Sequence, residues 1–359
     1  MPARTLSFAR DVWRNRRGTP GLPRMLTYTV TFACNARCVM CDSWKLPRRD
    51  ELTLEELQRI FAQLPVLDAV RLTGGEPLLR RDFPEIARLV QDHLQPRLLH
   101  VTSNGWLTER LVSFCEARWR RVPLYLLLSI DGMEEKHNQI RGSDRAWSRV
   151  METIHALAPR QKELRLRMAV NQTIVDAEGV EHYPRLRELL QSYGVQHRTV
   201  VAYDTSATYN GDGELEVAPD AAGDFNSFGD LPPEQLAAFF DRVARDLRDV
   251  PWCDRLAGRY YLRGIRNRLL HGSGKPNPPC VALNAHLRMF PDGDVPTCQF
   301  NGRTIGNLRR QSFREVWQGR RAEAQRAWVR KCPGCWAECE VLPSAIYTLD
   351  LARSLVGIS

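Results

Sequence analysis

The stretch MLTYTVTFACNARCVMC, residues 25–41, decides the fold that we predict for this chain. An apolar run at 25–33 leads directly into Cys34, Cys38 and Cys41, which have the spacing C-x3-C-x2-C. Three thiolates this close suit one soft metal centre, and both iron–sulfur clusters and zinc take such ligands. A four-iron cluster needs four ligands, so three cysteines would leave one iron open as a reaction site.

Around this stretch, β-rich apolar runs alternate with helical patterns over the first 200 residues. We expect strands at 26–32, 69–73, 98–102, 124–130, 164–174 and 196–201. We expect helices between them at 54–64, 83–94, 109–119, 146–157 and 180–193. Thr53, followed by acidic residues, is the predicted N-cap of the first helix. Such alternation predicts parallel strands with right-handed crossovers, and hence an α/β fold, a partial (β/α)6 TIM-like barrel.

Polar and glycine residues follow the predicted strands at the edge where ligands collect in such barrels. The second strand ends in Thr-Gly-Gly-Glu-Pro at 73–77, and the third ends in Thr-Ser-Asn-Gly at 102–105. The fourth ends in Ser-Ile-Asp-Gly at 129–132, and the fifth ends near Asn171. Glycines let the backbone approach a ligand closely. The series therefore predicts one shared ligand at this rim.

A second group of cysteines lies near the C-terminus, at Cys280, Cys298, Cys332, Cys335 and Cys339. The sequence Pro-Asp-Gly-Asp before Cys298 predicts a hairpin turn. Taken alone, this spacing favours a four-cysteine zinc site.

Together, these motifs resemble those of radical S-adenosylmethionine (SAM) enzymes, over residues 30 to about 175. The resemblance implies that Cys34, Cys38 and Cys41 hold a [4Fe–4S] cluster whose open iron takes the amino and carboxylate groups of SAM. It also implies SAM contacts from residues that follow the strands: Gly74, Gly75, Glu76, Pro77, Ser103, Ser129, Arg141 and Asn171. For Ser129, Arg141 and Asn171, strand-end capping or helix pairing is the alternative interpretation.

The C-terminal cysteines resemble the auxiliary-cluster modules of the same enzymes, called SPASM with two clusters or twitch with one. Cys280, Cys298, Cys332 and Cys335 match the twitch form, which implies one auxiliary [4Fe–4S] cluster. Zinc and a two-cluster arrangement are the alternatives. Cys339 departs from the longer series and either replaces a ligand or stays free.

Size, charge and cysteine content limit the cellular setting and the partners that we expect. The 359 residues have a net charge of +9 and include no run of 18 apolar residues, so no membrane span is expected. The chain has ten cysteines, most of them clustered at metal-site spacing. In a large chain without a signal peptide, this predicts a reducing, cytoplasmic setting. No nucleic-acid-binding motif occurs, so nucleic acid is not an expected partner. Residues 303–331 carry nine basic and two acidic residues, typical of a solvated helix or of a face that docks a flavodoxin or ferredoxin-type electron donor.

We predict five segments along the chain. These are a solvated basic N-terminal arm at 1–24, the radical SAM partial barrel at 25–202, a loop with connecting helices at 203–279, the twitch/SPASM-like module at 280–345 and a tail at 346–359.

The leading functional hypothesis is a radical SAM enzyme that removes a hydrogen atom from a small polar molecule, which is then oxidised, epimerised or undergoes elimination. The second is a maturase that modifies a ribosomally made peptide. Many maturases carry an N-terminal peptide-binding domain, and only 33 residues precede Cys34 here. The third is a zinc-stabilised binding protein without catalysis. No catalytic proton donor or acceptor can be identified from the sequence.

Overall fold

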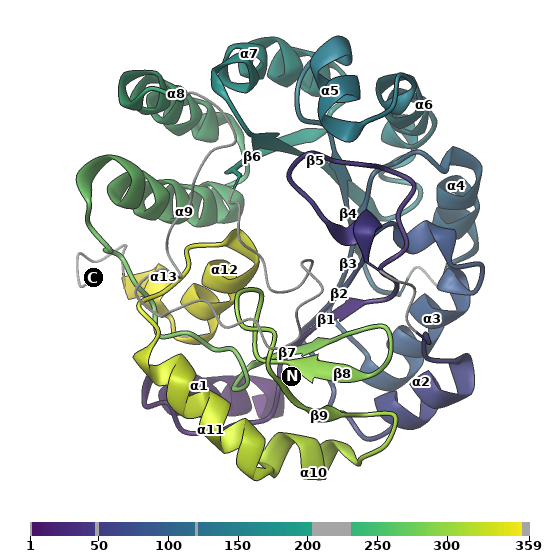
Figure 1. The fold of residues 1–359 in the computed structure, drawn as a ribbon, viewed down its shortest axis with the longest axis vertical. Coiled ribbons are helices and arrows are strands. Elements are labelled where there is room, and N and C mark those ends of the chain that lie inside the picture. Colours follow the sequence, from purple (N-terminus) through teal and green to yellow (C-terminus); the bar gives the residue numbers. More distant parts are fainter. Residues whose placement is uncertain (1, 47–49, 119–120, 203–230, 354–359) are drawn as a thin grey trace.

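A computed structural model describes residues 2–46, 50–118, 121–202 and 231–353. Its main feature is a seven-stranded parallel sheet with the strand order β6-β5-β4-β3-β2-β1-β7, which curves around a central space (Figure 1). The strands are β1 (Met25–Thr29), β2 (Ala69–Thr73), β3 (Leu98–Ser103), β4 (Leu124–Ser129), β5 (Leu166–Ile174), β6 (Gln196–Val201) and β7 (His286–Met289). The predicted α/β fold is confirmed, with the six predicted strands within a few residues of their expected positions.

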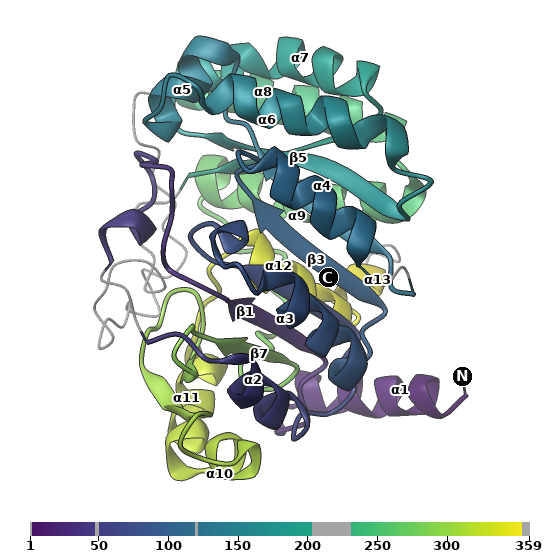
Figure 2. The ribbon, with the colours of Figure 1, turned by 90° about the vertical axis from the view of Figure 1, so that its right-hand side faces the viewer.

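Helices cover the outer face of this sheet, as Figure 2 shows. They are α2 (Leu54–Phe61), α3 (Phe83–Leu89) with its π-helical extension η3 (Val90–Leu94), α4 (Thr108–Ala117), α5 (Glu134–Arg141), α6 (Ala146–Leu157) and α7 (Ala177–Ser192). Short 3-10 turns are η1 (Ser43–Lys45), η2 (Pro77–Leu79), η4 (Ala158–Arg160) and η5 (Leu247–Asp249). Thr53 caps α2 in a capping box with Glu56, as predicted. Fully buried side chains such as Leu26, Leu72 and Phe83 fill the space between sheet and helices.

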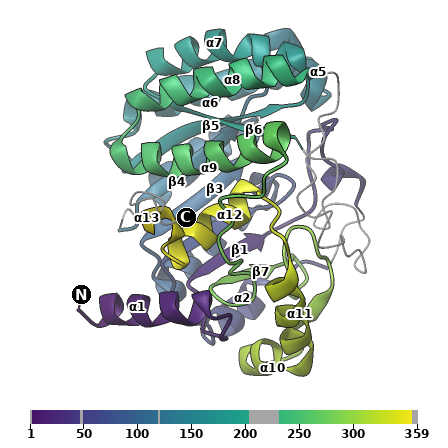
Figure 3. The same ribbon diagram turned by 90° about the vertical axis from the view of Figure 1, so that its left-hand side faces the viewer.

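In the C-terminal third of the chain, α8 and α9 lie beside the edge strand β6, and α12 lies between α9 and β7 (Figure 3). Its elements are α8 (Pro233–Asp246), α9 (Trp252–His271), β8 (Asp294–Pro296), β9 (Thr304–Asn307), α10 (Phe313–Gln318), α11 (Arg320–Lys331), α12 (Glu338–Tyr347) and α13 (Asp350–Arg353). Of the segment predicted as a loop with connecting helices at 203–279, residues 203–230 lie outside the described residues. No described helix is long and apolar enough to cross a membrane.

The predicted turn at 291–294 forms between β7 and β8. The N–H of Gly293 donates to the carbonyl of Phe290 at 3.0 Å, and the N–H of Phe290 donates to the carbonyl of Asp294 at 2.8 Å. The sequence did not show that β7 also pairs in parallel with β1, or that β8 pairs with β9.

The N-terminal segment is not a solvated arm. Residues 2–16 form helix α1 (Pro2–Arg16), which packs against α12: the Asn15 amide donates to the carbonyl of Tyr347 at 2.9 Å. Arg24 is buried and pairs with Asp11 at 2.8 Å and with Asp68 at 2.9 Å. The two carboxylates balance the charge of Arg24, which the sequence alone predicts to be exposed to solvent.

Candidate functional site

Cys34, Cys38 and Cys41 lie in the loop that follows β1, and their side chains line one cavity. Cys38 is buried and the other two are half-buried. Burial raises the pKa of the Cys34 thiol to about 12 and that of the Cys41 thiol to about 11. Burial therefore penalises their thiolate forms, and a cationic metal centre would offset that penalty. The donor set fits a thiolate-ligated cluster.

Gly74 and Gly75 hold the end of β2 directly against this cysteine loop. A Cβ atom on Gly74 would overlap the carbonyl oxygen of Thr31, and one on Gly75 would overlap that of Ala33. The N–H groups of Gly75 and Glu76 donate to these same carbonyl oxygens, each at 2.8 Å. The packing of the cysteine loop on β2 thus requires both glycines. Both also line the cavity, and their contact with a ligand stays a prediction.

Glu76 is fully buried, and its carboxylate joins β2 to β3. One carboxylate oxygen accepts hydrogen bonds from the Ser103 hydroxyl at 2.9 Å and from the N–H of Leu78 at 3.1 Å. The other accepts from the N–H of Asn104 at 2.8 Å. Burial raises the pKa of Glu76 to about 7. Neither Glu76 nor Pro77 lines the cavity, so their place is in the turn that shapes it.

Glu76 leads to a predicted pH dependence of stability. Its ordinary pKa of 4.5 rises to about 7 on folding, so the folded protein binds this proton more tightly than the unfolded chain does. As the pH rises from about 4.5 to about 7, the free energy of unfolding of the wild type should therefore decrease relative to that of Glu76→Gln. Urea unfolding of both proteins across this range checks the slope. A difference between them that does not change with pH would contradict the prediction.

The central cavity lies on the concave side of the sheet and contains about 1790 Å³ of empty space, including the part open to solvent. The sequence candidates that line it are Gly74, Gly75, Ser103, Ser129, Arg141 and Asn171. Asn171 pairs in register with Ser129, and its buried amide oxygen has no hydrogen-bond partner among the described residues. An acceptor without a partner at a cavity wall suits a ligand that donates a hydrogen bond.

Arg141 connects the cavity to the cysteine loop. Its Nε donates to Asp131 at 2.6 Å, and its Nη1 donates to the Cys38 sulfur at 3.4 Å. The backbone carbonyl of Arg141 also accepts from the N–H of Arg37 at 3.0 Å. Arg141 thus holds the cysteine loop in place, while its expected contact with the SAM carboxylate stays a prediction.

The cavity wall includes residues to which the sequence gave no role at this site: Trp44, Arg71, Arg288, Gln299 and Glu338. In β2, half-buried Arg71 alternates with buried Val70 and Leu72, a pattern that could have identified an inward-facing arginine. Arg288 could not be identified in this way, since its strand β7 was not predicted.

Four of the C-terminal cysteines form a group of their own. Cys280, Cys298, Cys332 and Cys335 line a separate pocket with about 500 Å³ of empty space. Cys339 instead lines the central cavity, where its sulfur accepts a hydrogen bond from Nη2 of Arg288 at 3.3 Å. Among the residues with described positions, no three or more His, Cys, Asp or Glu side chains are placed to hold a single metal ion.

The position of Cys339 leads to a test of the auxiliary ligand set. Because Cys339 faces the central cavity, Cys339→Ser should retain the full iron content of the reconstituted wild type. Cys335→Ser, the matched variant inside the four-cysteine pocket, should lose about four iron atoms per chain. Iron and sulfide analysis of the anaerobic proteins checks both. Loss of cluster iron from Cys339→Ser would make Cys339 a ligand and contradict this assignment.

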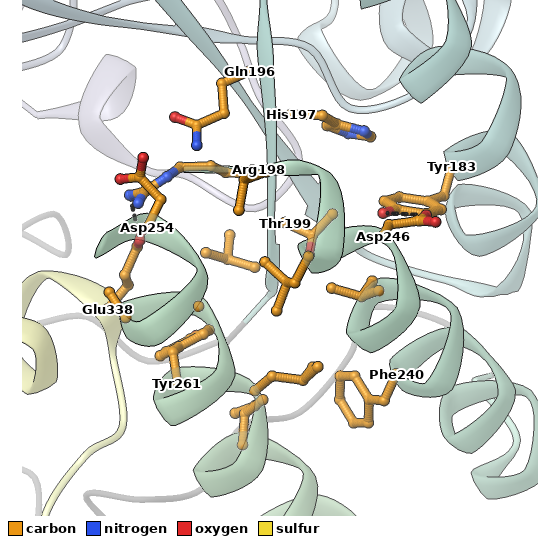
Figure 4. A pocket seen from close by; sticks show the side chains of 18 of the residues that line it. Tyr183, Gln196, His197, Arg198, Thr199, Phe240, Asp246, Asp254, Tyr261 and Glu338 are labelled. Carbon is orange, nitrogen blue, oxygen red and sulfur yellow. Dashed lines mark hydrogen bonds and ion pairs between the residues drawn. The ribbon is translucent and has the colours of Figure 1, made fainter. Parts of the chain in front are cut away.

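A second cavity lies beside the edge strand β6, between α7, α8 and α9 (Figure 4). Its walls include Tyr183 and His197, whose rings stack with centroids 4.9 Å apart. Tyr261 and Glu338 line both this cavity and the central one. Glu338 forms an ion pair with Arg198 at 2.8 Å. Because Glu338 lines both cavities, this ion pair lies between them. This contact ties α12 to the open edge of the sheet.

Two family models match the chain. The Radical SAM superfamily model matches residues 28–190, and an iron-sulfur cluster-binding domain model, SPASM, matches residues 280–339. A GTP 3′,8-cyclase from Aquifex aeolicus (strain VF5) is 28% identical over 316 residues, which are 83% of this chain and 90% of that protein.

Solved structures with the same fold include SuiB from Streptococcus suis bound to S-adenosylmethionine. It has a TM-score of 0.58 and 15% identity, and the match covers 89% of this chain and 71% of that one. Native anSMEcpe with bound AdoMet has a TM-score of 0.60 and 17% identity, and covers 94% of this chain and 97% of that one. At these identities the likeness concerns the fold.

Proposed function

Because this chain belongs to the radical SAM superfamily and carries a SPASM-type cluster-binding domain, we propose that it removes a hydrogen atom from a small polar substrate in the central cavity. Cys34, Cys38 and Cys41 would hold the [4Fe–4S] cluster to which SAM binds. The product would arise by oxidation, epimerisation or elimination. One observation carries the proposal: the cysteine loop and the polar strand ends line a single cavity.

When bound, the reduced cluster supplies one electron that converts SAM to methionine and a 5′-deoxyadenosyl radical. The chain's own residues position the reactants and limit access of water. Gly74 and Gly75 fix the cysteine loop on β2, and Arg141 donates a hydrogen bond to the Cys38 sulfur. Asn171 offers an acceptor to SAM, and Met40 adds an apolar side chain to the cavity wall that can cover the adenine.

For the C-terminal domain we propose one auxiliary [4Fe–4S] cluster, held by Cys280, Cys298, Cys332 and Cys335. The pocket that these four cysteines share, apart from Cys339, supports this set. Four thiolates would close the cluster to substrate, so its use would be to transfer electrons or to shape the cavity. A zinc site is the alternative. Zinc would leave that domain colourless, and the cluster adds broad brown absorbance.

A peptide is the second candidate substrate. SuiB bound to its precursor peptide SuiA has a TM-score of 0.58 with this chain, and anSMEcpe with bound Cp18Cys peptide has one of 0.57. We place a small molecule first because the relative with 28% identity is named for its action on GTP, a small polar substrate.

The electron source that we propose is a flavodoxin or ferredoxin-type protein with an acidic surface. The surface beside the cysteines supports this, because Val39 and Trp44 are exposed there. The Arg37 guanidinium lies 5.9 Å and the Lys45 ammonium 5.3 Å from the Trp44 ring centre. Lys45 pairs with Asp42 at 2.7 Å, so Arg37 is the cation that this surface offers beside the exposed apolar pair. Such a surface suits a partner with acidic residues around its redox centre.

The test is anaerobic incubation of the reconstituted protein with SAM and dithionite, followed by mass spectrometry for 5′-deoxyadenosine. We expect 5′-deoxyadenosine, and we expect deuterium from a labelled substrate to appear in it. A panel that contains GTP and short peptides then separates the two substrate classes. No 5′-deoxyadenosine from protein with its full iron content would overturn the proposal.

A further inference from the structure

Arg71 and Arg288 face the central cavity from the same level of the sheet. In register, Arg71 of β2 pairs with Thr27 of β1, and Thr27 pairs with Arg288 of β7. Residues that pair in register on adjacent strands share one face, and both arginines line the cavity. Arg71 precedes Gly74 by three residues, so it lies about 10 Å deeper along the strand than that glycine.

The two arginines differ in their partners. Arg288 forms an ion pair with Glu340, with Nε and the carboxylate oxygen 2.7 Å apart. Arg71 donates from Nε to Nδ1 of His100 at 3.1 Å, and no carboxylate pairs with it among the residues that the structure describes. Burial, together with Arg71, lowers the pKa of His100 well below 6.5. An imidazole is neutral or cationic, so His100 accepts this hydrogen bond without balancing the charge of Arg71.

Among the described residues, the other arginine at the cavity wall and the nearby Arg198 have carboxylate partners. Arg141 pairs with Asp131 at 2.6 Å, and Arg198 pairs with Glu338 at 2.8 Å. Arg71 is therefore an uncompensated, half-buried charge at the cavity floor, with the paired Arg288 two strands away. A half-buried guanidinium without an anion forgoes its strongest interactions, because planar oxyanions accept its N–H groups two at a time.

We propose that Arg71, assisted by Arg288, binds an oxyanion group of the substrate, a carboxylate or a phosphate, at the floor of the central cavity. The inference rests on the proposed function and specifies its substrate: the molecule carries an anionic group within reach of Arg71, whose backbone lies three residues below the strand-end Gly74. Arg71 acts as a positioning residue that sets which atom of the substrate lies near SAM.

The test uses the reconstituted holoenzyme with SAM and two probes. Tripolyphosphate is an inorganic phosphate, and tricarballylate is a simple organic carboxylate. Isothermal titration calorimetry should show saturable binding of at least one probe to the wild type. Arg71→Gln should weaken that binding about 10- to 100-fold, as expected for loss of charge-assisted hydrogen bonds. Arg71→Lys, which keeps the charge without the planar fork, should fall between the two. Preference for tripolyphosphate or for tricarballylate identifies the anion as phosphate or carboxylate.

Arg97→Gln is the matched control, because it removes the same charge from an exposed position outside the cavity. It should bind the probes as the wild type does. Equal affinity in Arg71→Gln and Arg97→Gln, or no binding of either probe to the wild type, would overturn the Arg71 site. Formation of 5′-deoxyadenosine by the wild type is measured in the same preparations. Its absence would count against the proposed function, separately from the anion result.

Discussion

Replacing Cys38 with serine should lower 5′-deoxyadenosine formation more than about 100-fold, because even outer partners of metal ligands are worth about 10- to 100-fold. The serine hydroxyl nearly matches the thiol in size but is a poor ligand for the iron of such clusters. Cys38 is the buried member of the three, and Arg141 donates to its sulfur at 3.4 Å. The measurement is single-turnover 5′-deoxyadenosine formation with dithionite, alongside iron content and electron paramagnetic resonance.

Cys253→Ser serves as the control, since Cys253 is exposed and lines neither cysteine pocket. It should keep both iron content and 5′-deoxyadenosine formation. If Cys38→Ser cleaved SAM at the rate of Cys253→Ser, then the residues at 34–41 could not be the cluster ligands, and the proposed site would be wrong.

Replacing Gly264 with alanine should lower the free energy of unfolding by about 3 kcal/mol, the upper part of the usual cost of overpacking. A Cβ atom at this position of α9 would overlap the six-membered ring of Trp336. That indole cannot yield easily: it is fully buried, stacks on Tyr260 at 5.6 Å, and lies under Arg268, whose guanidinium is 4.0 Å from the ring centre.

The same substitution should also reduce auxiliary-cluster iron, because Trp336 directly follows Cys335 and lines the four-cysteine pocket. Urea unfolding and iron analysis measure the two effects. Gly21→Ala is the control, since a Cβ atom at Gly21 would have no other atom within 4 Å. Unchanged stability and full iron content in Gly264→Ala would show that Trp336 does not brace the auxiliary site.

The strands and the cysteine loop could be predicted because their signals are local. β2 and β6 were predicted at their observed bounds from short β-rich runs, and polar residues at the ends of the second to fifth strands predicted the shared rim. Capping by Thr53 is equally local, since the partners are three residues apart. Such features depend on neighbours in sequence, which a single chain displays directly.

What could not be predicted depends on partners far away in the sequence. β7 becomes a strand by pairing with β1, about 260 residues earlier. Helix α1 docks through Asn15 on Tyr347, 332 residues away. The separation of Cys339 from Cys335 follows from the start of α12 between them, which turns successive side chains to different sides.

Electron-nuclear double resonance of the reduced protein with ¹⁵N- and ¹⁷O-labelled SAM tests the central claim most directly. If the cluster held by Cys34, Cys38 and Cys41 keeps one iron open for SAM, the amino nitrogen and a carboxylate oxygen should show strong hyperfine coupling to the cluster. These couplings should disappear in Cys38→Ser and persist in Cys253→Ser. A reduced cluster in the wild type that shows no coupling to either labelled atom would contradict the account.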